Sequence, residues 1–202
     1  MTRCRKIVGD ERGASAAEFA LVLPLLLLFL FGIIDAGRFM WEYNEAEKAT
    51  QMGVRYAAVT NPIAPGLSSY SFAVSGGIGA GNPVPTTSFD SMTCNKTSCS
   101  CTPGGSFCSA VGYDSAEFAA LVARMAAMYP PITEDNVTVE YRNVGLGFAG
   151  DPNGPDVAPL ITVRLTGLNF QPITTMFIGS TLTMPDFRAA LTLEDGSGTV
   201  SN

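Results

Sequence analysis

An uninterrupted apolar run near the N-terminus is the strongest constraint on how this chain can fold. The sixteen residues from Phe19 to Ile34 carry no charge, and extending the run back to Ala14 adds Glu18 as its only ionisable side chain. A helix over residues 14–34 has a length of about 32 Å, which matches the hydrocarbon core of a bilayer. We therefore predict a transmembrane span at about residues 14–34.

The basic residues before this span predict its direction. Four of the twelve Lys and Arg residues lie in the first thirteen positions: Arg3, Arg5, Lys6 and Arg12. The positive-inside rule then places the N-terminus in the cytoplasm and the C-terminal domain across the membrane. A cleaved secretory signal peptide is the alternative, but no A-x-A-like cleavage site follows Ile34.

Composition argues against catalysis and against nucleic-acid binding. The chain has no histidine, which excludes Ser-His-Asp and Cys-His machinery and His-containing metal sites. Its net charge of −6 does not suit a phosphate backbone. The glycine-rich run 76–81 leads into Asn82-Pro83 and lacks the following Lys of a phosphate loop. We expect no enzyme, no cofactor and no nucleic-acid partner.

Acidic residues offer two weak alternatives in the second half of the chain. Asp151 and Asp156, or Glu134 and Asp135, are candidates for a catalytic acidic pair by composition alone. The turn that holds Asp151 and Asp156 could also attract Ca²⁺, but it departs from the EF-hand spacing and lacks the downstream Glu. We favour a plain turn there.

Glu18 is costly at the start of a lipid-embedded helix and suggests a partner. If a peptidase cut after Gly13, the new α-amine of Ala14 would lie one helical turn before Glu18, or would face Glu18 of a neighbouring subunit. The alternative is that the Glu18 carboxylate simply reaches the cytoplasmic interface beside Arg12.

These residues carry a family resemblance. The stretch Arg12–Phe19 resembles the processing site of type IV pilin-like precursors, and residues 12–58 resemble the TadE-like family of tight-adherence (Tad/Flp) pilus proteins. The matching pieces are the Glu18-Phe19-Ala20 start, Pro24, Gly32-Ile33-Ile34-Asp35 and Gly53-Val54-Arg55-Tyr56-Ala57-Ala58.

The resemblance implies a minor pilin-like (pseudopilin) component of a Tad/Flp pilus or a type II/IV secretion-like machine. Residues 1–13 would be a cytoplasmic leader, cut between Gly13 and Ala14 by a prepilin peptidase, and Glu18 and Phe19 would make the assembly contact. The implied partners are that peptidase, other pilins and pseudopilins, the inner-membrane assembly platform and the lipid bilayer. The implied location is the bacterial inner membrane, single pass with a periplasmic C-terminal domain, or an extracellular pilus. The rival interpretation is an unprocessed, signal-anchored periplasmic binding or sensing domain.

Cysteine spacing predicts two disulfides beyond the span. Cys94, Cys99, Cys101 and Cys108 lie close together, whereas Cys4 stands alone in the leader. In an oxidising compartment an even set of four indicates two bridges. A Cys99–Cys101 bridge would close a very small ring, so the remaining pairings are 94–99 with 101–108, or 94–101 with 99–108. The spacing does not fit the C-x2-C pairs of a zinc site.

The rest of the chain predicts an α+β head. The first helix should continue to residue 58, with a stripe of mostly small residues suited to packing on its own head or on another subunit. Residues 59–195 form the periplasmic head: an irregular stretch 61–112, a helix that begins at Asp114 and ends before Pro130, and antiparallel strands at 137–142, 160–168 and 189–193, with a possible strand at 181–184. Residues 196–202 are predicted to be disordered.

Overall fold

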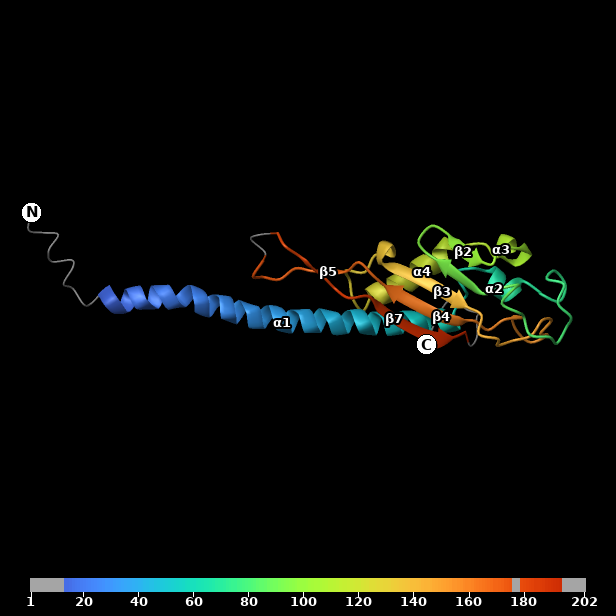
Figure 1. The fold of residues 1–202 in the computed structure, drawn as a ribbon, viewed down its shortest axis with the longest axis horizontal. Helices are drawn as coiled ribbons and strands as arrows, with labels where there is room; N and C mark the ends of the chain where they lie inside the picture. The colour runs from blue at the N-terminus through green and yellow to red at the C-terminus, as the bar shows by residue number, and fades with distance from the viewer. Residues whose placement is uncertain (1–12, 176–178, 194–202) are drawn as a thin grey trace, which may run out of the picture. The chain divides into compact units, whose positions relative to one another are not determined.

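The computed structural model describes residues 13–175 and 179–193 (Figure 1). The predicted leader up to Arg12, with Cys4 and the four basic residues, lies outside the described residues, and so does the predicted disordered tail. Within the described residues the fold is α+β, as predicted: a long N-terminal apolar helix, an antiparallel sheet with helices, and two disulfides.

Helix α1 runs from Ala14 to Val59 and includes Pro24, in agreement with the predicted continuous helix. Leu-rich and Glu/Lys-rich stretches favour a helix, and Pro62 cannot continue one. At the C-terminal end, the Thr60 hydroxyl donates to the carbonyl of Tyr56 at 2.8 Å and satisfies one of the last carbonyls of the helix.

The chain divides into two compact units. The first comprises α1 up to Trp41 together with Phe170–Leu182; the second comprises Glu42–Asn169 and the chain from Thr183 onward. The second half of α1 therefore belongs to the head.

A five-stranded antiparallel sheet in the order β2-β1-β3-β4-β7 organises the second unit. Its strands are β1 (Ser91–Cys94), β2 (Cys99–Thr102), β3 (Val137–Arg142), β4 (Leu160–Leu165) and β7 (Phe187–Thr192). A second sheet pairs β5 (Asn169–Phe170) with β6 (Leu182–Thr183).

One face of the large sheet is buried and the other is wet. The side chains of Val139, Tyr141, Ile161 and Val163 are fully buried, whereas Glu140, Thr162 and Arg164 on the same strands point to the open face. This is the alternation expected when only one face of an antiparallel sheet is packed.

Helices cover the buried side of the head. Helix α4 (Ser115–Ala126) begins at Asp114, whose side chain accepts from the backbone N–H groups of Ala116 and Glu117. Asp114 is therefore the N-cap of the helix, in agreement with the predicted start of this helix at Asp114. Gly53 of α1 allows Met125 of α4 to approach so closely that an added Cβ would lie 2.7 Å from its sulfur. The second half of α1 therefore packs on its own head, through the predicted small-residue stripe.

The short elements are helices α2 (Gly66–Ser69) and α3 (Ser106–Ala110) and the 3-10 turn η3 (Glu134–Asn136). Stretch 61–112 was predicted to be irregular, and this was incomplete because it contains β1, β2, α2 and α3. Strands β1 and β2 are only four residues long and rich in Ser, Thr and Cys, so they show no clear apolar alternation.

The strand predictions hold with changed ends. Strand β3 matches its predicted bounds, whereas β4 stops at Leu165, just before Gly167 with a φ of +71°. Strand β7 begins at Phe187, earlier than predicted, and ends at Thr192. The segment at 181–184 is the short strand β6, which belongs to the second sheet.

Candidate functional site

The first part of α1 presents an apolar surface that is left exposed by the described part of the chain. Leu21, Leu25 and Phe29 are 81%, 73% and 70% exposed. No residue in the most apolar stretch of α1 is buried. Among the described residues, α1 is the one helix long and apolar enough to cross a membrane. Because so much exposed apolar surface is unfavourable in water, this stretch belongs in a bilayer or against other helices.

The predicted processing and assembly residues lie at the start of this surface. Gly13 is exposed, immediately before the first residue of α1, and no side chain of the described residues beyond its chain neighbours lies within 4 Å of the position a Cβ would take. Glu18 and Phe19 are exposed on the helix, and Phe19 keeps 65% of its surface accessible.

The geometry at the N-terminus of α1 favours a negative charge. The first turn of the helix has no acidic residue, so its free N–H groups carry the positive end of the helix dipole without an acidic neighbour in that turn. Glu18 lies about 6 Å along the axis from Ala14, which is within reach of an α-amine on that residue.

Asp35, one residue beyond the predicted span, hydrogen-bonds a segment around Ile173 and Thr174 that is distant in sequence. Its Oδ1 accepts from the backbone N–H of Ile173 at 2.7 Å, and its Oδ2 accepts from the N–H and hydroxyl of Thr174 at 2.9 and 2.8 Å. Asp35 is buried, with 7% of its surface exposed, in a stretch whose neighbours are otherwise exposed. Carboxylates that accept several hydrogen bonds make strong attachments.

Aromatic and cationic contacts extend this attachment. The Arg38 guanidinium lies 5.3 Å from the ring centroid of Phe170 and 3.6 Å from the Asp35 carboxylate, and the Phe39 ring meets the Phe170 ring edge-on at 5.4 Å. We call Phe170–Leu182 the strap. Between the strap and α1 lies a mostly apolar groove of about 400 Å³.

The sequence pattern identified Asp35 only as part of the family-like motif and gave no role to the strap. The sequence did contain a signal for a partner of Asp35, since a carboxylate directly after an apolar run must be solvated or hydrogen-bonded. Its partners lie more than 130 residues away in sequence, and no periodicity could have named them.

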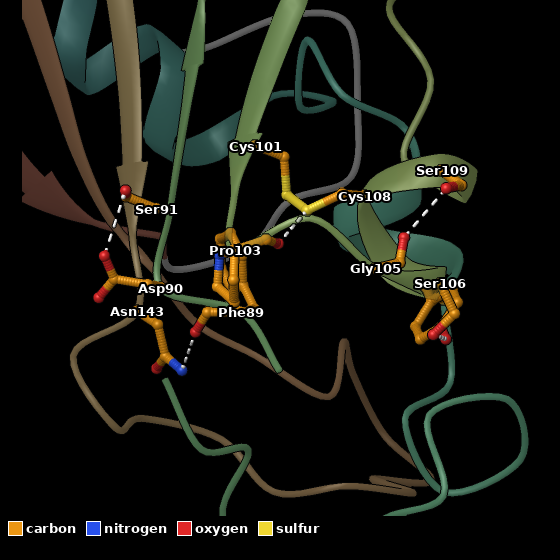
Figure 2. Close-up of a disulfide and its surroundings, with 11 residues drawn as sticks. Phe89, Asp90, Ser91, Cys101, Pro103, Gly105, Ser106, Cys108, Ser109 and Asn143 are labelled. Carbon is orange, nitrogen blue, oxygen red and sulfur yellow. Dashed lines mark hydrogen bonds between the residues drawn. A yellow bond between two sulfur atoms is a disulfide. The ribbon is translucent and has the colours of Figure 1, made fainter. Parts of the chain in front are cut away.

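The four predicted disulfide cysteines form two bridges, Cys94–Cys99 and Cys101–Cys108. This is one of the two pairings that the sequence left open. The first bridge closes the β1–β2 hairpin, and the second joins the end of β2 to α3 (Figure 2).

The surroundings of the second bridge are held by hydrogen bonds. In Figure 2 the Asn143 side chain donates to the carbonyl of Phe89 at 2.9 Å, and the Ser109 hydroxyl donates to the carbonyl of Gly105 at 3.0 Å. Asn143 also donates to the carbonyl of Val84 and so ties the preceding loop to the end of β3. The bridges thus fix a loop-rich end of the sheet.

The acidic candidates of the second half of the chain have structural roles. Asp156 is buried, and its oxygens accept from the backbone N–H groups of Phe72, Gly150 and Asp151. This carboxylate organises the turn, as the plain-turn interpretation requires. Asp135 pairs with Lys96 on the head surface. The described residues contain no group of three His, Cys, Asp or Glu side chains arranged to hold a metal ion.

A comparison with known families finds a likeness over most of α1. Residues 13–55 match the family model described as TadE-like protein. This N-terminal segment is similar to TadE-like proteins. The match covers the span, the strap-binding Asp35 and most of the second half of α1, and it ends before the sheet begins. The chain matches no curated protein and no solved structure.

The TadE-like segment associates this chain with the Tad pilus and its components. Together with the exposed apolar stretch of α1, it indicates a single-pass membrane anchor.

Proposed function

We propose that this chain is a minor pilin-like subunit, held in the inner membrane by α1 and assembled into a Tad pilus or related machine through that helix. The observation that carries the proposal is the combination of a TadE-like helix, exposed apolar side chains along its first half, and an exposed Glu18 near its start. A helix of this kind is stable only in lipid or against neighbouring helices, and an assembly of such helices can exchange one environment for the other.

In this proposal a prepilin peptidase cuts between Gly13 and Ala14. Cleavage removes the basic leader and creates an α-amine at Ala14. In apolar surroundings the charged Glu18 carboxylate requires a cationic partner, and the α-amine of the same or a neighbouring subunit supplies it. The contact with the assembly platform is non-covalent, and the chain has no catalytic step of its own.

The rival function is an unprocessed, signal-anchored binding or sensing domain. It draws support from the head itself, since the second half of α1, α4 and the large sheet form a folded unit around a common core. The groove beside the strap would be its ligand site. The state of the N-terminus separates the two functions.

The decisive experiment is N-terminal sequencing of the protein purified from membranes of cells that produce the pilus. A mature chain that starts Ala-Ser-Ala-Ala-Glu-Phe supports the proposal, whereas an intact Met-Thr-Arg start contradicts it. The variant Gly13→Leu should accumulate as a precursor larger by about thirteen residues, the length of the predicted leader. The matched control is Gly9→Leu, which changes another leader glycine and should be cut normally.

A further inference from the structure

We propose that β7 is a docking strand: it pairs along its free edge with an extended segment of another exported pilus protein, and that segment places a carboxylate beside Arg188. The identity of the partner as a pilus protein rests on the proposed function. The docking edge itself rests on the geometry of the sheet.

Strand β7 ends the sheet with unused hydrogen-bonding groups. The backbone N–H of Leu193 donates to the carbonyl of Pro159 at 2.9 Å and continues the register in which Leu191 faces Ile161 and Ala189 faces Val163. In an antiparallel ladder alternate residues point their N–H and C=O groups toward the neighbour, so those of Arg188, Ala190 and Thr192 point away from β4. No described residue forms a hydrogen bond with these outward groups.

The two edges of the sheet differ. At the opposite edge, β2 is bridged to α3 by the Cys101–Cys108 disulfide. Strand β7 has no such cover, contains no Pro or Lys, and carries small side chains at Ala189 and Ala190. Natural proteins usually block an exposed edge strand with Pro, Lys or a covering element, because the unpaired backbone groups of such a strand are a template for another strand.

Charges on the wet face indicate what kind of strand fits. Arg188 stands directly opposite Arg164 across β4 and β7, at a pair position where side chains approach closely. Like charges placed opposite each other are destabilising. The Glu140 carboxylate already forms ion pairs with two guanidinium groups, that of Arg142 at 2.7 Å and that of Arg164 at 3.0 Å.

Arg188 has no hydrogen-bonded or ionic partner among residues 13–175 and 179–193. A strand added to β7 would place a side chain next to Arg188 on the same face. An Asp or Glu there would supply the opposite charge that the sheet lacks and would select the partner segment by charge.

The other face of the edge has room for the alternate side chains of an added strand. A groove of about 270 Å³ lies between α1 and the start of β7, lined by Tyr43, Glu47, Thr50 and Gln51 from α1 and by Asp186–Ala189. In strand addition the main chain provides affinity, and such side-chain sites provide specificity.

A symmetric pairing of β7 with β7 of a second copy does not fit this location. In Figure 1, β7 runs alongside the second half of α1. Antiparallel pairing of two β7 strands would therefore point the second halves of the two α1 helices in opposite directions. Copies anchored in one membrane share one helix direction. The partner is consequently a different segment, contributed by another subunit.

The first test measures backbone amide exchange by NMR on the full chain in detergent micelles, with two synthetic probes: the blocked peptide Thr-Val-Thr-Glu-Val-Thr and its twin with Gln in place of Glu. With the Glu probe, the amides of Arg188, Ala190 and Thr192 should gain protection, while those of Ala189 and Leu191 are already protected. We expect the Glu probe to bind up to about 5-fold more tightly than the Gln probe. Protection without this alternation, equal binding of both probes, or no binding overturns the proposal.

Three variants sharpen this test. Arg188→Gln should abolish the preference for the Glu probe but retain binding, and Ala190→Pro should abolish binding of both probes by removing an outward N–H. Proline at such an edge position spares the β4 ladder. Ala190→Thr is the matched control and should bind like the wild type. If Arg188→Gln keeps the preference, the charge assignment is wrong, and this variant decides even if Ala190→Pro fails to fold.

The second test identifies the partner in piliated cells. A photoreactive benzoylphenylalanine replaces Thr192, and mass spectrometry identifies the crosslinked peptide. An extended segment with Asp or Glu in another pilus protein supports the proposal; a crosslink to β7 of a second copy, or none, contradicts it. Failure of cleavage at Gly13 would overturn the proposed function and leave the peptide test of the edge unaffected.

Discussion

At the scale of single residues, buried carboxylates in this protein join segments that are distant in sequence through hydrogen bonds. Asp35 collects three hydrogen bonds from two adjacent strap residues, and Asp156 collects three from two loops. In both cases a carboxylate satisfies backbone N–H groups that belong to no helix or strand, which is what buried irregular backbone requires.

The first prediction concerns Asp35. In Asp35→Ala, the N–H groups of Ile173 and Thr174 lose their acceptor, so their amide-exchange protection should fall several-fold while the amides of the large sheet keep theirs. Asp35→Asn retains one acceptor oxygen and should give an intermediate loss. Measurement is by exchange NMR on the full chain in micelles. Unchanged protection at Ile173 and Thr174 in the Ala variant would show that the strap is held by Phe170 and Pro172 instead.

The second prediction concerns Glu140 and pH. The hydrogen bond from Arg142 lowers the pKa of Glu140, partial burial opposes this, and the charges of Arg142 and Arg164 lower the pKa further. A carboxyl whose pKa is lower in the folded protein stabilises it above the ordinary pKa, and this stabilisation is lost as pH falls through the folded value.

Glu140→Gln should therefore lower the unfolding free energy at pH 7 by a few tenths of a kcal/mol, up to about 1 kcal/mol, since the arginines are half exposed. The difference from wild type should shrink as pH falls below the ordinary glutamate pKa of about 4.3 and should disappear below the lowered pKa of Glu140 in the folded protein. Urea unfolding at several pH values measures it. A difference that grows toward acid would contradict the assignment.

At the scale of elements, the sequence was most informative where a pattern is long or a cap is explicit. The extent of α1, the Asp114 cap of α4 and strand β3 were predicted from periodicity and turn chemistry. Strands β1 and β2 were missed because β1 is stabilised by pairing with β3, and β2 by pairing with β1 and by the disulfides. A four-residue Ser/Thr/Cys strand has no sequence signature of its own.

The candidate site divides in the same way. Gly13, Glu18 and Phe19 were predicted because a local motif carries them, and their roles stay predictions. The sequence placed Asp35 in the family-like motif but did not predict its hydrogen bonds to the strap. The location of the strap is not encoded by any local pattern. The free edge at β7 also could not be read from sequence, because an edge is a property of the strand order.

The third prediction concerns the Cys101–Cys108 bridge. This bridge closes a short loop between β2 and α3, and the loop-closure entropy of that length corresponds to about 2.5 kcal/mol. The double variant Cys101→Ser with Cys108→Ser should lower the unfolding free energy by roughly 2 to 3 kcal/mol in urea unfolding of the full chain in micelles. Cys4→Ser is the control, and it should leave stability unchanged. If the double variant is as stable as wild type, α3 and β2 are held by packing alone.

At the scale of the whole molecule, one chain combines a lipid-compatible helix with a folded head. The first half of α1 exposes nearly all of its apolar side chains, and the second half buries its small-residue stripe in the head. A single helix thus changes its surroundings along its length, because the sequence changes from Leu-rich to mixed Glu, Ala and Gly. This division suits a subunit whose head folds independently of where its span lies.

The fourth prediction tests the role of Glu18 in assembly. Glu18→Gln should insert into the membrane and fold normally, but its share in the pilus fraction should fall. A charge-assisted contact contributes about 1.5–3 kcal/mol, which corresponds to a decrease of about tenfold or more. Immunoblots of pilus and membrane fractions measure this. Glu134→Gln, an exposed glutamate of the head, is the control, and equal incorporation of both variants would remove Glu18 from the assembly contact.

The unequal edges of the sheet set a limit on stoichiometry. If β7 is the edge that accepts a strand, as proposed, the head has a valence of one for strand pairing. A monovalent unit joins a growing structure once and offers no second position for the next copy. Under the two proposals together, strand pairing alone would not propagate a fibre, repeated addition would occur through the helices, and each head would occupy one site on its neighbour.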